Sequence, residues 1–192
     1  MTQTLDKPTD RRFIHSGVSW EKFKLIEAGF DDSPGIRLFY YEGEVEILAV
    51  SQEHETISRF TGLLLVTYFV DKGIEFKPTG RFTQEREGVV SAQADESYFL
   101  VSEGITPDLC IEVVFNSGIE KKLNRYQALG VPEAWFWEDG RFAIYCLRGD
   151  SYERVSKSEV LPDLDIELLS RCLLMTSRVE AVREFRRGIS QS

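Results

Sequence analysis

The chain has 192 residues, which is the size of one large domain. Hydrophobic residues make up 42% of it and charged residues 29%, the proportions of an ordinary folded protein. A chain of this length buries roughly 70% of its unfolded surface, so neither a disulfide nor a metal is needed to hold the fold. The formal net charge is −9, from 23 basic and 32 acidic residues. It disfavours non-specific coating of nucleic acid, but it is compatible with an acidic site that binds divalent cations.

The sequence contains few of the residues that build disulfides or zinc sites. Its three cysteines are Cys110, Cys146 and Cys172, and no pair of them has the spacing of zinc ligands. With only two histidines, a zinc site built mainly from His and Cys is not expected. The longest apolar stretch, residues 63–70, is far shorter than the ~20 residues of a membrane span, and residues 1–12 lack the apolar region of a signal peptide. A cytoplasmic protein with reduced thiols is therefore expected.

The N-terminal part is predicted to begin with a flexible segment, residues 1–16, because it is polar and terminal. Residues 17–192 are predicted to form a single domain. A first helix is predicted over residues 18–28, since Ser19 can cap its N-terminus and Gly29 can end it.

A hairpin and a long helix are predicted next. Residues 37–41 and 45–50 favour strands, and the Glu-Gly-Glu sequence at 42–44 between them favours a turn. Residues 51–72 are predicted to form a helix that ends at the following glycine. The middle of this helix, residues 60–70, is apolar around nearly its whole circumference. Such a helix is buried on several sides, either in the core or in a subunit interface.

A further helix over residues 117–130 is predicted from the residues at its ends. Ser117 and Glu120 form an S-x-x-E capping box, Gly130 lies at the C-terminal end, and Pro132 follows.

The remaining elements complete a mixed sheet. Strands are predicted at residues 74–77, 80–84, 96–101, 108–115, 133–137, 141–147 and 152–155. Asp139-Gly140 favours a hairpin between two of them, and residues 165–187 are predicted to form one last helix. The fold class is therefore α+β, with a mixed β-sheet core flanked by helices.

The predicted strand over residues 108–115 carries the most informative residue. Its odd-numbered side chains form one apolar face, and Glu112 lies in the middle of the other. A glutamate in a core-like strand is costly unless it is paired or bound to a metal. Asp95 opens the preceding strand. Two carboxylates that converge from adjacent strands form a hard-oxygen site suited to Mg²⁺ or Mn²⁺.

A lysine also points toward this strand. At 100° per residue, Lys122 falls within the apolar stripe of the helix that follows, whereas Lys121 and Arg125 fall outside it. An inward Lys122 can reach over the sheet to Glu112. Phosphodiester hydrolysis uses such a set of Asp, Glu and Lys around a metal. The metal polarises a phosphate oxygen and activates the attacking water, while the lysine orients the water or stabilises developing charge.

Each residue also has a purely structural interpretation. Asp95 can cap a turn, Glu112 can form a buried ion pair with a lysine, and Lys122 can extend along the helix flank to solvent. The residues alone leave both interpretations open.

Four segments resemble the Uma2 family, also called DUF820. The segments PDLCIEVVFNSG and KKLNRYQALGVPEAWFW carry the resemblance, and the second is the more specific. RLFYYEGEVEILAVSQEHE is similar to the family's opening hairpin and long helix, and QADESYFL to its P-D strand. The resemblance covers about residues 35–187. It implies a restriction-endonuclease-like PD-(D/E)XK fold and an endonuclease that uses Mg²⁺ or Mn²⁺, with DNA as the expected substrate.

The resemblance also implies roles for individual residues. Asp95 matches the aspartate of the P-D motif and Glu112 the acidic residue of the (D/E)XK motif, so both are expected to ligate the metal. Ala94 replaces the motif proline, and Val114 stands where the standard motif has lysine. The family commonly has an apolar residue at that point, with Lys122 as the migrated catalytic lysine.

Three expectations remain open at this stage. His54 matches a histidine common in the family, and helix capping or a local hydrogen bond is the alternative role. The alternative function is a non-catalytic dimeric interaction or regulatory module on the same fold, and hydrolysis of another phosphate ester is a third. A homodimer is expected, because the helix over 51–72 has more apolar surface than one sheet covers, and a two-fold nuclease can address both strands of a duplex.

Overall fold

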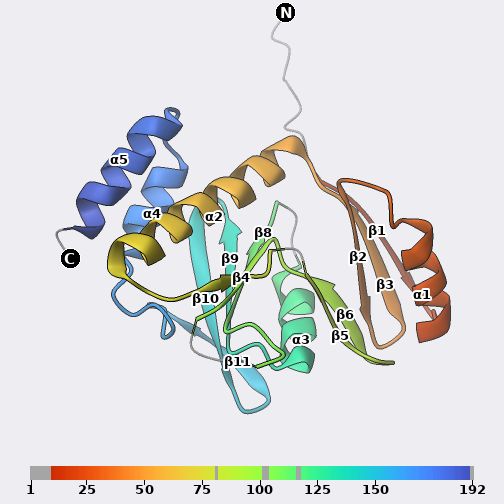
Figure 1. Ribbon diagram of the computed structural model, residues 1–192. Helices are drawn as coiled ribbons and strands as arrows, with labels where there is room; N and C mark the ends of the chain where they lie inside the picture. Colours follow the sequence, from red (N-terminus) through yellow and green to blue (C-terminus); the bar gives the residue numbers. More distant parts are fainter. Residues whose placement is uncertain (1–9, 81, 101–103, 116–117, 191–192) are drawn as a thin grey trace, which may run out of the picture.

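The computed structural model describes residues 10–80, 82–100, 104–115 and 118–190, and this part of the chain has five helices and two sheets (Figure 1). The helices are α1 (Trp20–Gly29), α2 (Gln52–Lys72), α3 (Ile119–Leu129), α4 (Ile166–Leu173) and α5 (Arg178–Ile189). The strands are β1 (Arg11–Ser16), β2 (Ile36–Tyr41), β3 (Glu44–Ala49), β4 (Lys77–Pro78), β5 (Thr83–Arg86), β6 (Val90–Gln93), β7 (Glu96–Phe99), β8 (Leu109–Val113), β9 (Glu133–Glu138), β10 (Arg141–Arg148) and β11 (Ser151–Val155). The predicted α+β class is confirmed.

The first sheet has the strand order β1-β3-β2-β6-β5. β2 and β3 form the predicted hairpin, and its two turn residues, Glu42 and Gly43, have left-handed φ angles of 45° and 86°. β1 pairs with β3 along its whole length, from Arg11 opposite Ala49 onward. Residues 11–16 are therefore a strand, and the prediction of a flexible segment is wrong for them, because the outer edge of β3 offers free backbone groups for pairing. Residues 1–9 lie outside the described residues.

The second sheet has the strand order β11-β10-β9-β8-β7-β4. β8 and β9 are parallel, and α3 supplies the crossover between them, whereas β7 is antiparallel to β8. β9 and β10 form the predicted hairpin around Asp139 and Gly140. β8 is thus a central strand, and all five of its residues are buried.

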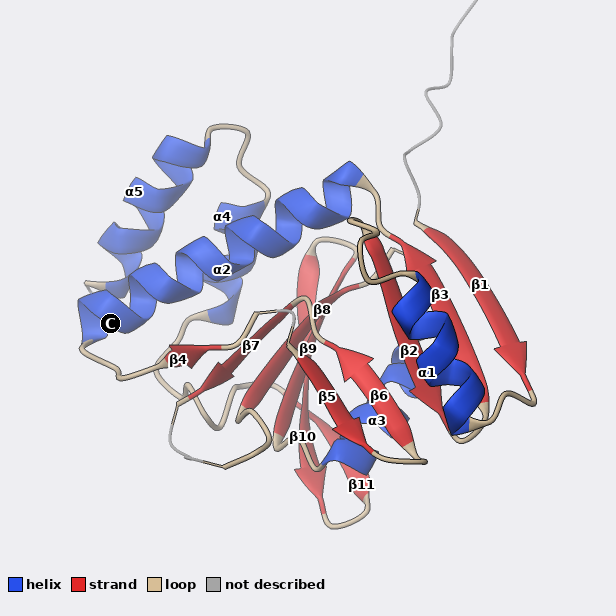
Figure 2. Ribbon diagram, turned by 45° about the vertical axis from the view of Figure 1, so that its right-hand side comes forward, coloured by secondary structure: helices blue, strands red, loops and turns tan. Residues whose placement is uncertain are grey.

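Helices cover both faces of this second sheet (Figures 1 and 2). α2, α4 and α5 pack against Ile111 of β8 and Trp135 of β9 in the main core. α3 packs on the other face, against Cys110 and Phe136. Because side chains alternate along a strand, Glu112 points to the α3 face.

α2 begins and ends where its local signals predict. The Ser51 hydroxyl accepts a hydrogen bond from the His54 N–H at 3.2 Å, and Gly73 ends the helix in the left-handed conformation. α4 and α5 cover much of its remaining apolar surface, but Leu63 and Val70 stay 50% and 63% exposed. None of the helices in the described ranges, α2 included, is long and apolar enough to cross a membrane.

The predicted single helix over residues 165–187 is wrong, because the structure divides it into α4 and α5. Each helix has its own N-cap. The Asp165 side chain accepts from the Leu168 N–H at 2.9 Å, and the Ser177 side chain accepts from the Glu180 N–H at 3.3 Å. The break lets α5 fold back against both α4 and α2 (Figure 1).

Smaller differences concern strand ends and one cap. β6 was not predicted, and it consists of four residues that pair with β2 and β5. β4 begins at Lys77 rather than at residue 74. α3 begins after Gly118, which has no side chain to cap the helix, while Ser117 of the predicted capping box lies outside the described residues.

Candidate functional site

Glu112 lies in the middle of β8, and its carboxylate is buried against α3. Lys122 Nζ donates to Glu112 Oε2 at 2.6 Å, and the Tyr126 hydroxyl donates to Oε1. Lys122 and Tyr126 are one helical turn apart on α3, so both reach the carboxylate from the same helix face. The inward orientation predicted for Lys122 agrees with this ion pair.

A second buried carboxylate, Glu46 of β3, faces the same helix. Arg12 donates to its two oxygens at 2.6 and 3.1 Å, and Arg125 of α3 also contacts Oε2. Burial works to raise the pKa of Glu46, but the charge of Arg125 and the hydrogen bonds from Arg12 and Arg125 outweigh it and lower this pKa to about 2. Arg125 is only 2% exposed, so the prediction that it lies outside the buried stripe of α3 is wrong. The buried stripe is wider than predicted because the first sheet also packs on α3.

The ring of Phe39, on β2, supports both of these cations. Lys122 Nζ lies 5.2 Å from the ring centroid, and the Arg125 guanidinium lies 4.7 Å from it. Lys121 instead points outward and pairs with Glu44 at 2.7 Å, with its side chain 47% exposed. The first sheet therefore helps to hold Lys122 toward the interior.

Asp95 lies between β6 and β7, and its carboxylate is completely buried. The Val113 N–H donates to Asp95 Oδ2 at 2.6 Å, and the Arg37 guanidinium contacts Oδ1. His54 Nε2 lies 2.9 Å from both oxygens. Arg37 also pairs with Glu55 of α2 at 2.9 Å. An internal cation thus neutralises Asp95 in this conformation.

His54 joins Asp95 to the N-terminal part of the chain. His54 Nδ1 donates to Asp10 Oδ2 at 2.7 Å, and the other Asp10 oxygen accepts from the Ser51 N–H at 2.7 Å. Burial works to raise the pKa of Asp10, but the hydrogen bonds from His54 and Ser51 outweigh it and lower this pKa. Asp10 directly precedes β1, so the pairing of β1 brings it to the histidine. His54 is therefore fixed by contacts with two distant segments as well as by the start of its own helix.

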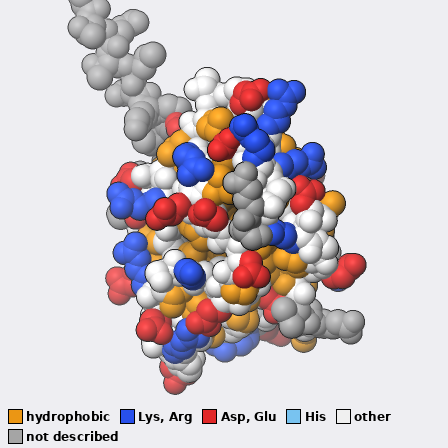
Figure 3. All heavy atoms as spheres, turned by 90° about the vertical axis from the view of Figure 1, so that its left-hand side faces the viewer, with side chains coloured by type: hydrophobic (Ala, Val, Ile, Leu, Met, Phe, Trp, Pro, Cys, Tyr) orange, Lys and Arg blue, Asp and Glu red, His pale blue; other side chains and the backbone are white. Residues whose placement is uncertain are grey.

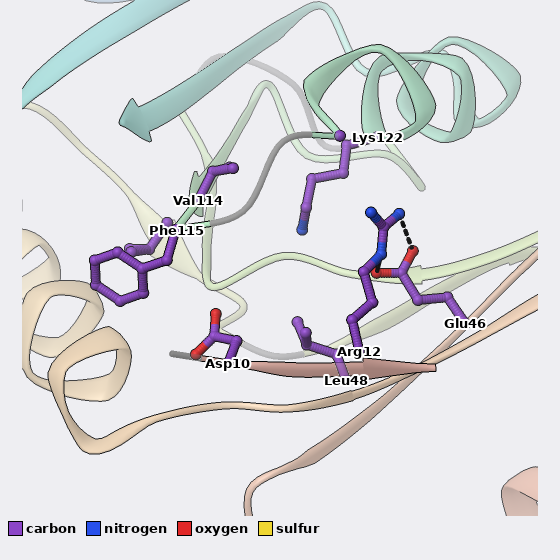
Figure 4. A pocket seen from close by; sticks show the side chains of 9 residues that line it. Asp10, Arg12, Glu46, Leu48, Val114, Phe115 and Lys122 are labelled. Carbon is purple, nitrogen blue, oxygen red and sulfur yellow. Dashed lines mark hydrogen bonds and ion pairs between the residues drawn. The ribbon is translucent and has the colours of Figure 1, made fainter. Parts of the chain in front are cut away.

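A small cavity of about 20 Å³ lies where the two sheets and α3 meet (Figure 4). Asp10, Arg12 and Glu46 line one side of it, and Val113 and Lys122 line the other. Lys122 reaches into this space from α3, while Asp10 and Arg12 reach toward it from the opposite side (Figure 4). The volume admits about one water molecule next to the lysine ammonium.

The structure gives Asp95 and Glu112 different partners. In the described ranges, no group of three or more His, Cys, Asp or Glu side chains is placed to hold a metal ion. Mg²⁺ needs fewer protein ligands, since it commonly binds one or two carboxylates and takes its other ligands from water or phosphate oxygens. Glu112 fits such a site, because its two donors leave about one lone pair on each oxygen. At Asp95, Val113, His54 and Arg37 occupy the carboxylate oxygens, so an ion bound there would have to displace Arg37 from Oδ1.

Comparison with known proteins agrees with this fold. Residues 20–177 match the family Uma2, described as "Putative restriction endonuclease". The chain belongs to the Uma2 family. Among solved structures, a putative nuclease belonging to DUF820 from Anabaena variabilis ATCC 29413 is similar, with a TM-score of 0.51 and 15% sequence identity. The match covers 88% of this chain and 99% of that chain, and it shows that the mixed α+β fold is shared with that DUF820 structure. No curated protein matches the chain.

Sequence reasoning on this Uma2 protein missed Asp10, Arg37, Glu46 and Tyr126. Glu46 interrupts an apolar strand of the first hairpin, which is the same signal that singled out Glu112, whereas Arg37 is the first residue of its predicted strand. Tyr126 belongs to the apolar stripe of α3, where nothing distinguishes it from a core residue. Asp10 stands in a polar segment that carries no pattern.

Proposed function

We propose that this Uma2 protein is a Mg²⁺- or Mn²⁺-dependent endonuclease that hydrolyses phosphodiester bonds in DNA. The observation that carries the proposal is the buried ion pair between Glu112 on the central strand β8 and Lys122 on α3, which lines a water-sized cavity. In this proposal Asp95 and Glu112 ligate the metal, and Lys122 is the catalytic lysine. The description of the family as putative restriction endonucleases supports the reaction class.

The side chains have two roles in this proposal, metal binding and stabilisation of the charge that develops on the phosphate. Asp95 and Glu112 would hold the ion through carboxylate oxygens, and Arg37 would turn away from Asp95 while keeping Glu55 as its partner. A bound Mg²⁺ supplies polarisation of a phosphate oxygen and a lower pKa for the attacking water. Lys122 orients that water or stabilises the charge that develops on the phosphate, since its ammonium already reaches the cavity.

Isothermal titration with Mn²⁺ is expected to show binding by the wild-type protein and no signal for Asp95→Ala. Asp95→Asn is expected to give the same loss, and the amide leaves less empty volume around Arg37. The reason is that hard divalent cations bind a charged carboxylate oxygen more strongly than a neutral amide oxygen.

Asp108→Asn is the matched control for this titration. Asp108 is also buried near β8, but its carboxylate accepts from the Leu100 N–H at 2.8 Å and is not part of the proposed site. It should bind Mn²⁺ like the wild type. An unchanged isotherm in both Asp95 variants would remove Asp95 from the site.

The alternative function is a non-catalytic interaction or regulatory module on the same fold. Two observations favour it: Asp95, Glu112 and Glu46 all contact internal cations, and the chain has a net charge of −9. The two functions differ in metal binding. A wild-type protein that binds neither Mn²⁺ nor Mg²⁺ would support the module.

The proposed enzyme is expected to be a homodimer. Leu63 and Val70 of α2 stay exposed after α4 and α5 have packed. Leu174, at the end of α4, and Val179, at the start of α5, are 65% and 60% exposed. On the face that carries α4 and α5, hydrophobic side chains lie among acidic and basic ones (Figure 3). Light scattering at micromolar concentration should give twice the mass of the chain. A monomer mass would show that the apolar surface left on α2 needs no partner subunit, and it would contradict this prediction.

A further inference from the structure

The second sheet contains another buried glutamate, Glu133, whose carboxylate has a purely structural role. Glu133, at the start of β9, is 1% exposed. Its oxygens accept from five donors, namely Trp135 Nε1, Ser158 Oγ, Cys146 Sγ and the backbone N–H groups of Glu159 and Val160. A carboxylate offers about four lone-pair sites, so Glu133 has none to spare. Its role is to join β9, β10 and the segment at residues 158–160.

Glu112 is equally buried but its oxygens are used differently. In the described part of the chain it accepts from two donors, Lys122 and Tyr126, one on each oxygen. About one lone pair on each oxygen is left for another group. Unused lone pairs on a buried charge cost free energy, so this arrangement favours a ligand that takes them.

Of these two donors, Tyr126 is the one that is rigidly held. Its ring is 1% exposed and packs with Cys110, Val114 and Phe136. Its backbone carbonyl accepts from the Val131 N–H at 3.0 Å, where α3 ends. The phenol donates to Glu112 Oε1, because an ionised carboxylate can only accept a hydrogen bond. Tyr126 is therefore a fixed hydrogen-bond donor.

We infer that Tyr126 is a positioning residue that holds the Glu112 carboxylate so that its free lone pairs face the metal ion. This inference rests on the proposed function. Lys122 holds only one of the two oxygens, Oε2, and the described donor to Oε1 is the phenol of Tyr126. Without the phenol, Glu112 can rotate about its own side-chain bonds.

Tyr126→Phe tests the inference, because it removes the hydroxyl and keeps the ring. Mn²⁺ titrated into the full-length variant is expected to bind about tenfold more weakly than to the wild type, a typical cost of losing a partner of a metal ligand. The matched control is Tyr152→Phe. The Tyr152 hydroxyl donates to the Val131 carbonyl at 2.6 Å and does not contact Glu112. This control loses one phenol hydrogen bond and should keep wild-type affinity.

A rescue variant separates positioning from general packing. Tyr126→4-aminophenylalanine keeps an N–H donor at the same place and is expected to restore wild-type Mn²⁺ affinity. Thermal unfolding of all variants shows whether each one is folded. If Tyr126→Phe does not fold, the Mn²⁺ affinity of Tyr126→4-aminophenylalanine tests the inference. Wild-type affinity of this variant supports the inference, and weaker affinity overturns it.

The possible failures are distinguishable. If Tyr126→Phe binds Mn²⁺ as tightly as the wild type or more tightly, the positioning role is wrong and the proposed metal site stands. If the amino variant is as weak as Tyr126→Phe, the donor is not what matters and the inference is also wrong. If the wild type does not bind Mn²⁺, the proposed function and the inference both fall.

Discussion

Arg37→Gln is expected to lower the free energy of unfolding by about 3 kcal/mol, as breaking a buried ion pair usually does. The Arg37 side chain is 1% exposed and contacts both Asp95 and Glu55. Its removal leaves Asp95 charged and buried, with His54 and the Val113 N–H as its remaining partners. The midpoint and slope of urea denaturation measure this change.

Arg148→Gln is the matched control for that experiment. Arg148 forms exposed ion pairs with Glu153 and Glu159, which water screens, so little change is expected. Mn²⁺ should stabilise Arg37→Gln more than the wild type, because a divalent cation can replace the guanidinium at Asp95. Equal urea midpoints for Arg37→Gln and Arg148→Gln would show that Asp95 does not depend on Arg37.

Lys122→Ala is expected to slow Mg²⁺-dependent cleavage of supercoiled plasmid DNA by about 100-fold or more. That is the usual cost of removing a group that stabilises charge in the transition state. Lys121→Ala is expected to cleave at nearly the wild-type rate, because Lys121 lies at the surface and pairs with Glu44. Single-turnover rates of both variants, beside the wild type, measure the difference.

Lys122→Ala also leaves Glu112 buried without its cation, so the variant should unfold at a lower temperature. The cleavage assay is therefore run at a temperature at which circular dichroism shows that Lys122→Ala is folded. Full activity in Lys122→Ala would show that Lys122 serves only as the partner of Glu112. Loss of cleavage in Lys121→Ala would instead assign the catalytic role to Lys121.

Elements with signals next to them in the sequence were predicted closely. α2 lies between the cap at Ser51 and Gly73, and the hairpin of β9 and β10 turns at Asp139-Gly140. Caps and turns depend on neighbouring residues, so the sequence contains what is needed to place them. The residues between α4 and α5 are different. Ser177 is as suitable for a cap as many exposed serines are, and only the packing of α5 against α2 shows that a second helix begins there.

The contacts of the candidate site show the same difference between local and distant residues. Glu112 and Lys122 are 10 residues apart in the chain, and the periods of a strand and a helix predict that they point toward each other. Glu46 and Arg125 are 79 residues apart, and no period relates them. Glu46 and Arg125 meet because both sheets, the first as well as the second, pack on α3.

The sequence by itself determined the α+β class, most of the helices and strands, the burial of Glu112 and the inward direction of Lys122. The tertiary structure decided which charges meet. The pairing of β1 with β3 brings Asp10 to His54, and Arg37 on β2 reaches Asp95, where the chain passes from β6 of the first sheet to β7 of the second. The physical reason is that local patterns record which way a side chain points, whereas its partner depends on how distant segments pack around it.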